Sequence, residues 1–375
     1  MDKTALLYKM ADEGGTYFLS RPRRFGKSLT LSTFEAYFKG QKELFKGLAM
    51  ETLEHDWHEH IVLSLSFGRG NYLKEGELDE ILRRFLERTE TKLGLKQMSS
   101  SLSERLYDII EGAYEKSGRG VVVLVDEYDK PLLDVMDSQI TVDVSGTKIP
   151  LEEYHRDTLR GFFSVLKDCD QYLRFVMITG ITKFPQVSIF SGLNNLSDIS
   201  LSDQYDSICG ITQEEFEKDL QEGIIELSDA YSWTYDETIK RLKKQYDGYH
   251  FSERMVDVYN PFSLINALYN KKLRNYWFST GSPSFLIRLM SRNKMTLESL
   301  AGKYYADEEL NDYRANINNP LPIIFQSGYL TIKDYDNERN RYLLDLPNDE
   351  VKAGFIKLVS DDFFNASTDT ESFGQ

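Results

Sequence analysis

Apolar runs alternate with helical repeats along the first 210 residues of this chain. The predicted strands are TYFLS at 16–20, IVLSLSF at 61–67, GVVVLVDEYD at 120–129 and RFVMITGI at 174–181. Between them, apolar residues that recur on one face predict helices over 27–39, 76–95, 101–116 and 151–168. Strands that alternate with helices predict an α/β fold, with a parallel sheet sandwiched by helices.

Helical patterns dominate after Gly210. The segment ITQEEFEKDL opens with Thr212, and Glu215 follows three residues later, which is the capping-box pattern of a helix start. Two helices are predicted from there to Tyr246. An Asn-Pro pair at 260–261 marks the entry of a further helix.

The last third of the chain predicts a winged-helix-like domain. NYWFSTGSPSFLIRLM at 275–290 predicts a turn and then a helix. Residues 320–359 predict helix, strand, polar turn, strand and helix, which is the order of a winged helix. At 375 residues the chain exceeds one core of ordinary size. We therefore expect an α/β domain over 1–210, a helical lid region over 211–255 and a winged-helix-like domain with a polar tail over 256–375.

Composition is typical of a globular cytoplasmic protein. Hydrophobic residues make up 41% of the chain, so a packed core is expected. No apolar run is long enough for a membrane-spanning helix, and the charged N-terminus is unlike a signal peptide. Cys169 and Cys209 stand far apart without a CxxC pattern, which fits a reducing compartment.

Charge is unevenly distributed. The chain carries a net charge of −15, which disfavours non-specific attraction to nucleic acid. Residues 1–50 nevertheless hold nine Lys and Arg against five Asp and Glu. The excess centres on Arg21, Arg23, Arg24 and Lys27, so it needs a local explanation.

SRPRRFGKS at 20–28 supplies that explanation, because it matches the second half of the phosphate-binding pattern GxxxxGK[ST]. The loop follows a predicted strand and opens a predicted helix, as the motif requires. Its backbone N–H groups would face the β-phosphate, Lys27 would reach the β- and γ-oxygens, and Ser28 would place its hydroxyl on Mg²⁺. Arg21 replaces the first glycine, and a merely basic loop is the alternative. The expected nucleotide contacts are Arg23, Arg24, Phe25, Gly26, Lys27, Ser28 and Leu29.

The apolar strand that ends in Asp126-Glu127 is a Walker B pattern. Asp126 is expected to hold Mg²⁺, directly or through water, because a hard cation prefers carboxylate oxygens. Glu127 is expected to orient the attacking water. The alternative is a strand that simply ends in acidic residues, and the phosphate-binding loop upstream disfavours it.

The strand that ends in ITGITK offers a third element. Thr179 or Thr182 would lie beside the γ-phosphate, in the position called sensor 1, and Lys183 would add positive charge. A plain strand end is the alternative. The expected catalytic set is Glu127, Lys27 and Thr179, acting by positioning and electrostatics. No NKxD-type guanine motif is present, so ATP is expected rather than GTP.

EHDWHEH at 54–60 spaces three histidines like metal ligands. The stretch is strongly polar and precedes a predicted strand, so we interpret His55, His58 and His60 as part of a solvated loop. His155 and His250 stand alone and are interpreted as packing or capping residues.

Segments spread over the chain carry a family resemblance. They include DKTALLYKM, YFLSRPRRFGKSLTLST, VLVDEYDKPL, TGITKF, YNPFSLINAL and NYWFSTGSPSFL. These segments resemble the AAA-ATPase-like family of bacterial proteins, over residues 2 to about 355. The resemblance implies that Lys27 and Ser28 are Walker A residues and that Asp126 and Glu127 are Walker B residues. It also implies that arginine at position 21 is normal.

Family members usually carry a nuclease-like domain of the PD-(D/E)xK type after the winged-helix region. This chain is expected to be a fragment or a shortened member without that domain, and without metal-dependent DNA cleavage of its own. A nuclease-like domain or protein is an expected partner, with nucleic acid only through it. No membrane partner is expected, and an oligomer is compatible with the sequence.

The function expected is that of an ATP-binding and ATP-hydrolysing regulatory module. The cofactors expected are ATP and Mg²⁺. The change from bound ATP to its hydrolysis products would reposition the helical and winged-helix regions. Two alternatives stay open, a nucleotide-dependent switch with negligible turnover and a nucleic-acid-binding module that acts through the winged helix. A small-molecule kinase is a more distant alternative.

Overall fold

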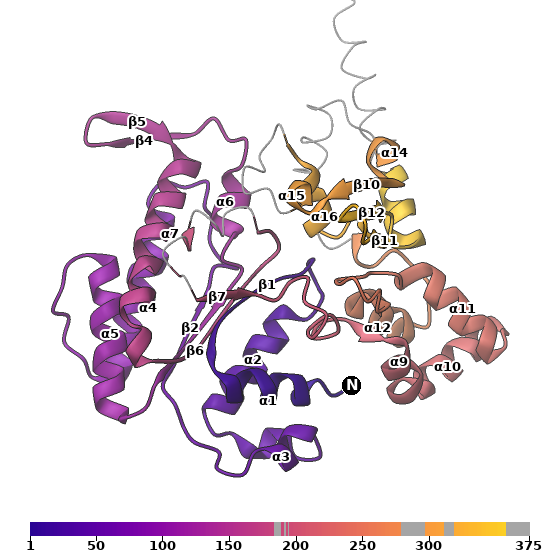
Figure 1. Ribbon diagram of the computed structural model, residues 1–375, viewed down its shortest axis with the longest axis horizontal. Coiled ribbons are helices and arrows are strands. Elements are labelled where there is room, and N and C mark those ends of the chain that lie inside the picture. Colours follow the sequence, from indigo (N-terminus) through magenta and orange to yellow (C-terminus); the bar gives the residue numbers. More distant parts are fainter. Residues whose placement is uncertain (184–188, 191–192, 194, 279–296, 311–318, 358–375) are drawn as a thin grey trace, which may run out of the picture. The chain divides into compact units, whose positions relative to one another are not determined.

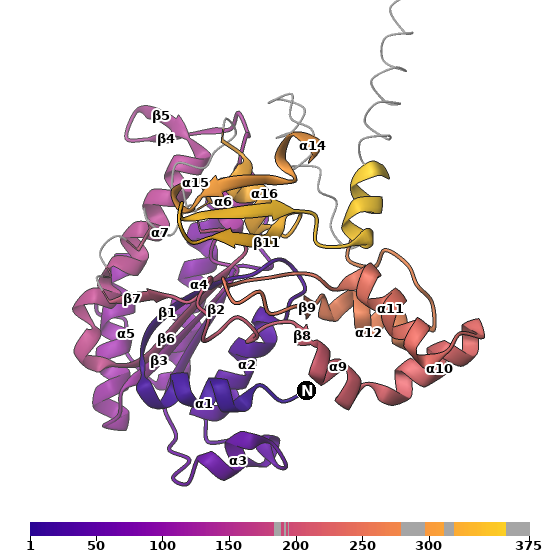
Figure 2. The same ribbon diagram turned by 45° about the vertical axis from the view of Figure 1, so that its right-hand side comes forward.

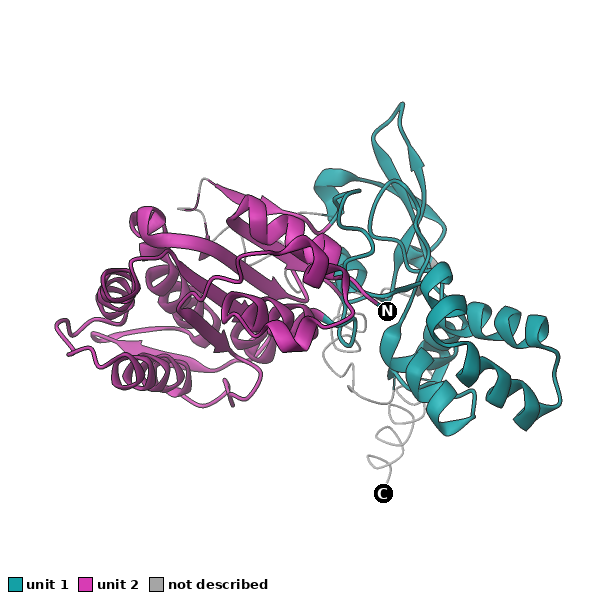
Figure 3. Cartoon of the chain, turned by 90° about the horizontal axis from the view of Figure 1, so that it is seen from below, with its two compact units in different colours: residues 1, 22–26, 201–375 teal, residues 2–21, 27–200 magenta. Residues whose placement is uncertain are grey.

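The structure is a computed structural model that describes the chain except residues 184–188, 191–192, 194, 279–296, 311–318 and 358–375. The chain divides into two compact units (Figure 3). Unit 2 comprises Asp2–Arg21 and Lys27–Ser200, and unit 1 comprises Met1, Pro22–Gly26 and Leu201–Gln375. A short piece of the SRPRRFGKS loop therefore groups with the C-terminal half of the chain.

Unit 2 is built on a parallel five-stranded sheet in the order β2-β3-β6-β1-β7. Its strands are β1 (Gly15–Ser20), β2 (Val62–Ser66), β3 (Val121–Asp126), β6 (Leu173–Gly180) and β7 (Leu196–Asp198). The predicted strands are all confirmed. β7 was not predicted, because it has three residues and none of them is fully buried.

Helices cover both faces of this sheet (Figures 1 and 2). One layer contains α4 (Glu77–Leu93), α5 (Leu102–Ser117) and α7 (Leu151–Asp168), whose apolar faces join the strands in the main core. The other layer contains α1 (Thr4–Glu13) and α2 (Lys27–Phe38). Phe34 and Phe38 of α2 pack on Phe175 of β6, with ring centroids 4.7 and 5.1 Å apart. The α/β fold with a parallel sheet between helices is therefore confirmed.

Shorter elements complete unit 2. They are η1 (Lys42–Phe45), α3 (Ala49–Leu53), α6 (Lys130–Val135), η2 (Asp170–Tyr172) and the antiparallel hairpin of β4 (Thr141–Val144) with β5 (Thr147–Pro150). The hairpin lies in the polar stretch before α7. Its strands are mostly exposed, so little apolar alternation marks them in the sequence.

Unit 1 begins with a helical array. Its helices are α9 (Gln213–Asp219), α10 (Gln221–Tyr231), α11 (Tyr235–Tyr246) and α12 (Pro261–Asn270), and β8 (Ile211–Thr212) pairs antiparallel with β9 (Val258–Tyr259). The capping box of Thr212 and Glu215 is confirmed. Three helices rather than two run to Tyr246, because the backbone at Leu220 leaves the helical region without a Gly or Pro to announce it.

The rest of unit 1 contains a three-stranded antiparallel sheet in the order β10-β12-β11. The elements are α14 (Leu297–Leu300), β10 (Lys303–Ala306), α15 (Asp307–Leu310), α16 (Leu321–Gln326), β11 (Thr331–Asp336) and β12 (Arg341–Asp345), followed by helical residues 349–357. The predicted helix, strand, turn, strand and helix are present. Most of the helix expected within 275–290 lies outside the described residues, and the winged-helix assignment stays a prediction.

No helix in the described part of the chain is both long and apolar enough to cross a membrane.

Candidate nucleotide site

The carboxyl ends of three neighbouring strands meet at one edge of the sheet in unit 2. Ser20 of β1 is in register with Gly180 of β6, and Val125 of β3 is in register with Ile178 of β6. Ligands of open parallel sheets bind at this edge, where the loops after the strands converge. The three predicted motifs all follow these strand ends.

Ser28, Asp126 and Thr179 form one hydrogen-bonded group at this edge. The Ser28 hydroxyl donates to Oδ2 of Asp126 at 2.6 Å, and the Thr179 hydroxyl donates to Oδ1 at 2.8 Å. Ser28 lies in the first turn of α2 and is exposed, whereas Thr179 is fully buried. The structure thus brings together one residue from each predicted motif.

Glu127 occupies an unusual backbone conformation. Its φ is 54°, in the left-handed region that non-glycine residues rarely adopt. Its carboxylate lies against Gly68, where an added Cβ would stand 2.9 Å from Oε2. Partial burial raises the pKa of Glu127, neighbouring Asp126 adds to the rise, and Lys27 opposes it. Strained residues of this kind cluster at functional sites.

Lys27 is the first residue of α2 and is 7% exposed. Its ammonium group donates to the backbone carbonyl of Arg21 at 2.7 Å. The ammonium group is therefore held against the backbone at the start of the loop.

Arg21 stands where the motif has its first glycine, and its side chain is buried. Its side chain is 1% exposed, and Nη1 donates to the carbonyls of Ser20 and Ser200 at 2.9 and 2.6 Å. The hydroxyl of Ser200 accepts from the Ser20 N–H at 2.8 Å. Arg21 therefore anchors the end of β1 and does not contribute to the exposed basic surface.

Residues 22–26 of the loop make their contacts within unit 1. Arg23 and Arg24 are exposed, and the Arg24 guanidinium lies 4.9 Å from the centroid of the Phe262 ring. Phe25 is 1% exposed and packs edge-on against Tyr249 and Phe251, at centroid distances of 4.8 and 5.4 Å. The side chain of Phe25, one of the predicted nucleotide contacts, therefore packs in the core of unit 1.

Trp277 links this segment to a buried carboxylate. Its indole N–H donates to the Arg23 carbonyl at 3.0 Å, and its backbone N–H donates to Glu350 at 2.8 Å. Glu350 is 1% exposed, and burial raises its pKa to about 7. The sequence alone did not single out Trp277 or Glu350 for a role at the loop, because both lie more than 250 residues downstream of it.

The remaining predicted loop residues lie at the start of α2. Gly26 has a φ of 99°, which a residue with a Cβ rarely adopts, and it precedes the first helical residue. Leu29 is 71% exposed, so its side chain is not part of the core. Its backbone lies in the first turn of α2, next to that of Ser28.

Thr182, the alternative to Thr179, binds a different carboxylate. Its hydroxyl and its N–H both donate to Oδ2 of Asp129 at 2.7 Å. Asp129 is 1% exposed and also accepts from the Ile181 N–H at 3.0 Å. Lys183 pairs with Asp198 at 3.0 Å. Asp129 was not singled out from the sequence, although its place in the DEYD segment after β3 was the available signal.

The discounted histidines behave as ordinary residues. His55 and His58 are exposed, and half-buried His60 contacts the Gly120 carbonyl through Nδ1 at 2.8 Å. Nδ1 of His155 faces the Pro131 carbonyl, and His250 contacts Asp257 at 2.7 Å. Within the described ranges, no three His, Cys, Asp or Glu side chains lie close enough to hold a metal ion together.

The parallel sheet between helices and the loop that leads from β1 into α2 define a P-loop nucleoside triphosphatase fold of the AAA-like class. The chain belongs to the AAA-ATPase-like family, described as predicted AAA-ATPases, whose family model matches residues 1–190.

An uncharacterised protein of the vnfD 5′ region of Azotobacter chroococcum mcd 1 is 36% identical over 362 residues. The match covers 96% of this chain, and the chain spans only 66% of that relative. Among solved structures, the ORC2 protein of Aeropyrum pernix, determined as ADPNP and ADP complexes, has 11% identity and a TM-score of 0.33. That comparison covers 96% of this chain and 92% of the other, and a likeness at this TM-score says nothing of function.

Proposed function

We propose that this protein binds Mg·ATP at the edge of its parallel sheet and hydrolyses it. The observation that carries the proposal is the group formed by Ser28, Asp126 and Thr179, at 2.6 and 2.8 Å. A hydroxyl at a helix start and a carboxylate at a strand end are the oxygen ligands that a P-loop protein offers to Mg²⁺.

The donor set fits a hard cation. Ser28 and Asp126 would hold Mg²⁺, which would neutralise charge on the phosphate oxygens. The backbone N–H groups from Arg23 to Leu29 and the N-terminus of α2 would bind the β-phosphate. Lys27 would leave the Arg21 carbonyl and bind the β- and γ-oxygens.

Glu127 is proposed to orient and deprotonate the attacking water. Its partly buried carboxylate has a raised pKa, so it is a stronger base than an exposed glutamate. Its left-handed backbone points to a residue that the surrounding fold holds in place. Thr179 is proposed as the sensor of the γ-phosphate, because its hydroxyl already contacts Asp126.

We further propose that nucleotide state is coupled to unit 1. Residues 22–26 would have to adjust when phosphate binds, and their contacts to Phe251, Phe262 and Trp277 would change with them. A cytoplasmic module of this kind would act on a nuclease-like domain or protein, as the family resemblance implies, and an oligomer is compatible with this role.

The test is calorimetric titration with a non-hydrolysable ATP analogue, with and without Mg²⁺, with ADP and GTP as comparisons. A parallel assay follows phosphate release from ATP. Binding without measurable release would replace the ATPase by a nucleotide-dependent switch. A failure to bind in the presence of Mg²⁺ would refute the nucleotide site, and binding of DNA instead would favour the winged-helix alternative.

A further inference from the structure

A groove runs along the open edge of the sheet in unit 2, on the side of β2 that faces away from β3. It has a volume of about 880 Å³ and is lined by residues of β2, of one face of α4 and of the end of α2. Among the described residues, β2 pairs only with β3. The groove is therefore bounded on one side by a strand that lacks a neighbour.

The open side of β2 presents hydrogen-bonding groups of the backbone. The Ile61 carbonyl accepts from the Val122 N–H, and the Phe67 N–H donates to the Asp126 carbonyl. The backbone N–H and C=O groups of the odd-numbered residues therefore point toward β3. Backbone groups of a strand point alternately to its two sides. The N–H and C=O groups of Val62, Ser64 and Ser66 consequently face the groove, where they offer pairing for one further strand.

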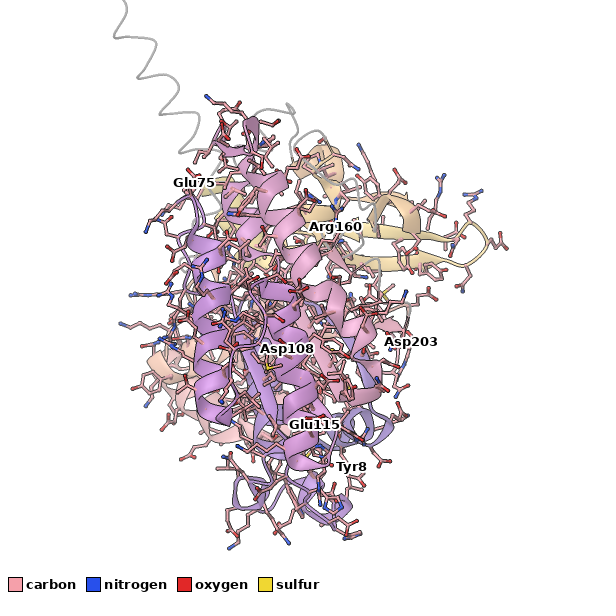
Figure 4. The ribbon with its side chains drawn as sticks, turned by 90° about the vertical axis from the view of Figure 1, so that its left-hand side faces the viewer. Tyr8, Glu75, Asp108, Glu115, Arg160 and Asp203 are labelled. Carbon is pink, nitrogen blue, oxygen red and sulfur yellow. The ribbon has the colours of Figure 1, made fainter. Side chains whose placement is uncertain are left out.

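The groove is basic in an acidic protein. Arg69, Arg88 and Lys92 line it and form no ion pair within the described part of the chain. Lys39 is paired with Glu35, and Arg84 lies near Glu77 and Glu80. This excess of positive charge is confined to the groove. The neighbouring helix α5 carries acidic residues that include Asp108 and Glu115 (Figure 4).

The basic residues also have the right spacing for a strand. Arg84, Arg88 and Lys92 follow each other at four-residue intervals on α4, which places them about 6 Å apart along the helix. Alternate residues of an extended peptide lie about 6.6 Å apart and point to the same side. Acidic side chains at every second position would therefore meet the basic residues one by one.

We propose that this groove binds an extended acidic segment of a partner protein, which adds a parallel or antiparallel strand to β2. The backbone of β2 would supply affinity, and the cationic face of α4 would select peptides with Asp or Glu at alternate positions. Nucleic acid is the less favoured ligand, because a phosphodiester backbone offers acceptors but no donors, so it cannot match the alternating N–H and C=O groups of the strand edge. None of the residues that line the groove belongs to the proposed ATP site, although Ser66 at its end is in register with Asp126.

The test uses fluorescence anisotropy with a labelled peptide of about nine residues that alternates Glu and Thr, a length sufficient to pair with β2. Three comparison probes are a peptide with Lys in place of Glu, one with N-methyl groups on alternate amides, and single-stranded DNA of similar length. The protein variants are R88E with K92E, S64P, and R83E as the control. Arg83 lies on the same helix, is exposed and does not line the groove.

The acidic peptide is expected to bind, and R88E/K92E should weaken it about tenfold or more, whereas R83E should change it less than about twofold. S64P removes an outward N–H, and it should weaken binding without lowering the melting temperature. The N-methyl and Lys peptides should bind poorly. The proposal is overturned if no acidic peptide binds, if the N-methyl peptide binds equally well, if R83E matches R88E/K92E, or if DNA binds the groove more tightly.

Discussion

The hydroxyl of Ser28 donates a hydrogen bond to the carboxylate of Asp126 across 2.6 Å, although 98 positions separate the two residues in the chain. Ser28 lies in the first turn of α2, the helix that follows β1, and Asp126 ends β3, which is two places from β1 in the sheet order. A hydroxyl and a carboxylate at this distance can share one hard cation. This relationship therefore leads to a prediction about magnesium.

S28A should abolish the contribution of Mg²⁺ to ATP binding. We expect affinity for the ATP analogue to fall roughly tenfold to a hundredfold in Mg²⁺ and to change little in EDTA, because the variant loses a ligand and not the phosphate loop. S32A is the matched control, since Ser32 lies on the same helix and donates only to the Leu29 carbonyl. Equal losses with and without Mg²⁺ would contradict the proposed metal ligand.

E127Q should separate binding from hydrolysis. The amide keeps the size of the side chain but cannot take a proton, so phosphate release should fall by about a hundredfold or more. Affinity for the ATP analogue, measured by calorimetry, should stay within about threefold, because Glu127 is proposed to contact water and not the nucleotide. Unchanged turnover would remove Glu127 from the mechanism.

W277F should weaken nucleotide binding from a distance. The phenyl ring keeps most of the packing but leaves the Arg23 carbonyl without the indole donor, at a cost of about 1 kcal/mol, or roughly fivefold in affinity. W233F is the control, because Trp233 stacks on Tyr231 and Arg241, away from residues 22–26. Equal affinities of W277F and wild type in calorimetry would argue against coupling through this contact.

Glu350 should make stability depend on pH. Its native pKa of about 7 exceeds the ordinary value of 4.5, so its contribution to stability is full below about pH 4.5 and is lost as pH rises through 7. E350Q stays neutral, so its stability relative to wild type should rise between pH 5 and 8, on the order of 3 kcal/mol at most.

Urea unfolding at several pH values measures this difference. Asp247, whose pKa is raised to about 6 by burial, contributes with the same sign in both proteins and cancels in the comparison. E338Q, in the exposed turn before β12, serves as the control and should follow the wild type. A difference between E350Q and wild type that does not change with pH would contradict the assignment.

G180A should destabilise unit 2 at the end of β6. An added Cβ would lie 2.5 Å from the Tyr128 ring and 2.8 Å from Asp129, so the loop that carries Thr182 must shift. We expect a loss of about 1–3 kcal/mol in urea unfolding. G161A is the control, because nothing lies within 4 Å of its Cβ and alanine favours a helix. A G180A protein as stable as G161A would show that the contact is not tight.

Local patterns in the sequence were sufficient to predict most of unit 2. The strands around Phe18, Val123 and Ile178 are runs of apolar residues because both of their faces are buried. The P-loop was recognisable because Gly26, Lys27 and Ser28 are contiguous and follow a strand. The short edge strand β7 escaped prediction because three residues leave no apolar period, and the break at Leu220 did so because no Gly or Pro stands at that position.

What the sequence determined by itself was the set of proposed site residues and the order of the main strands and helices that carry them. Tertiary structure decided which of two threonines contacts Asp126, that Arg21 is an anchor, and that Trp277 contacts Arg23. The physical reason is the distance along the chain over which each kind of interaction acts. Helix and strand periods arise between near neighbours along the chain, whereas these hydrogen bonds join residues whose separation in sequence carries no local signal.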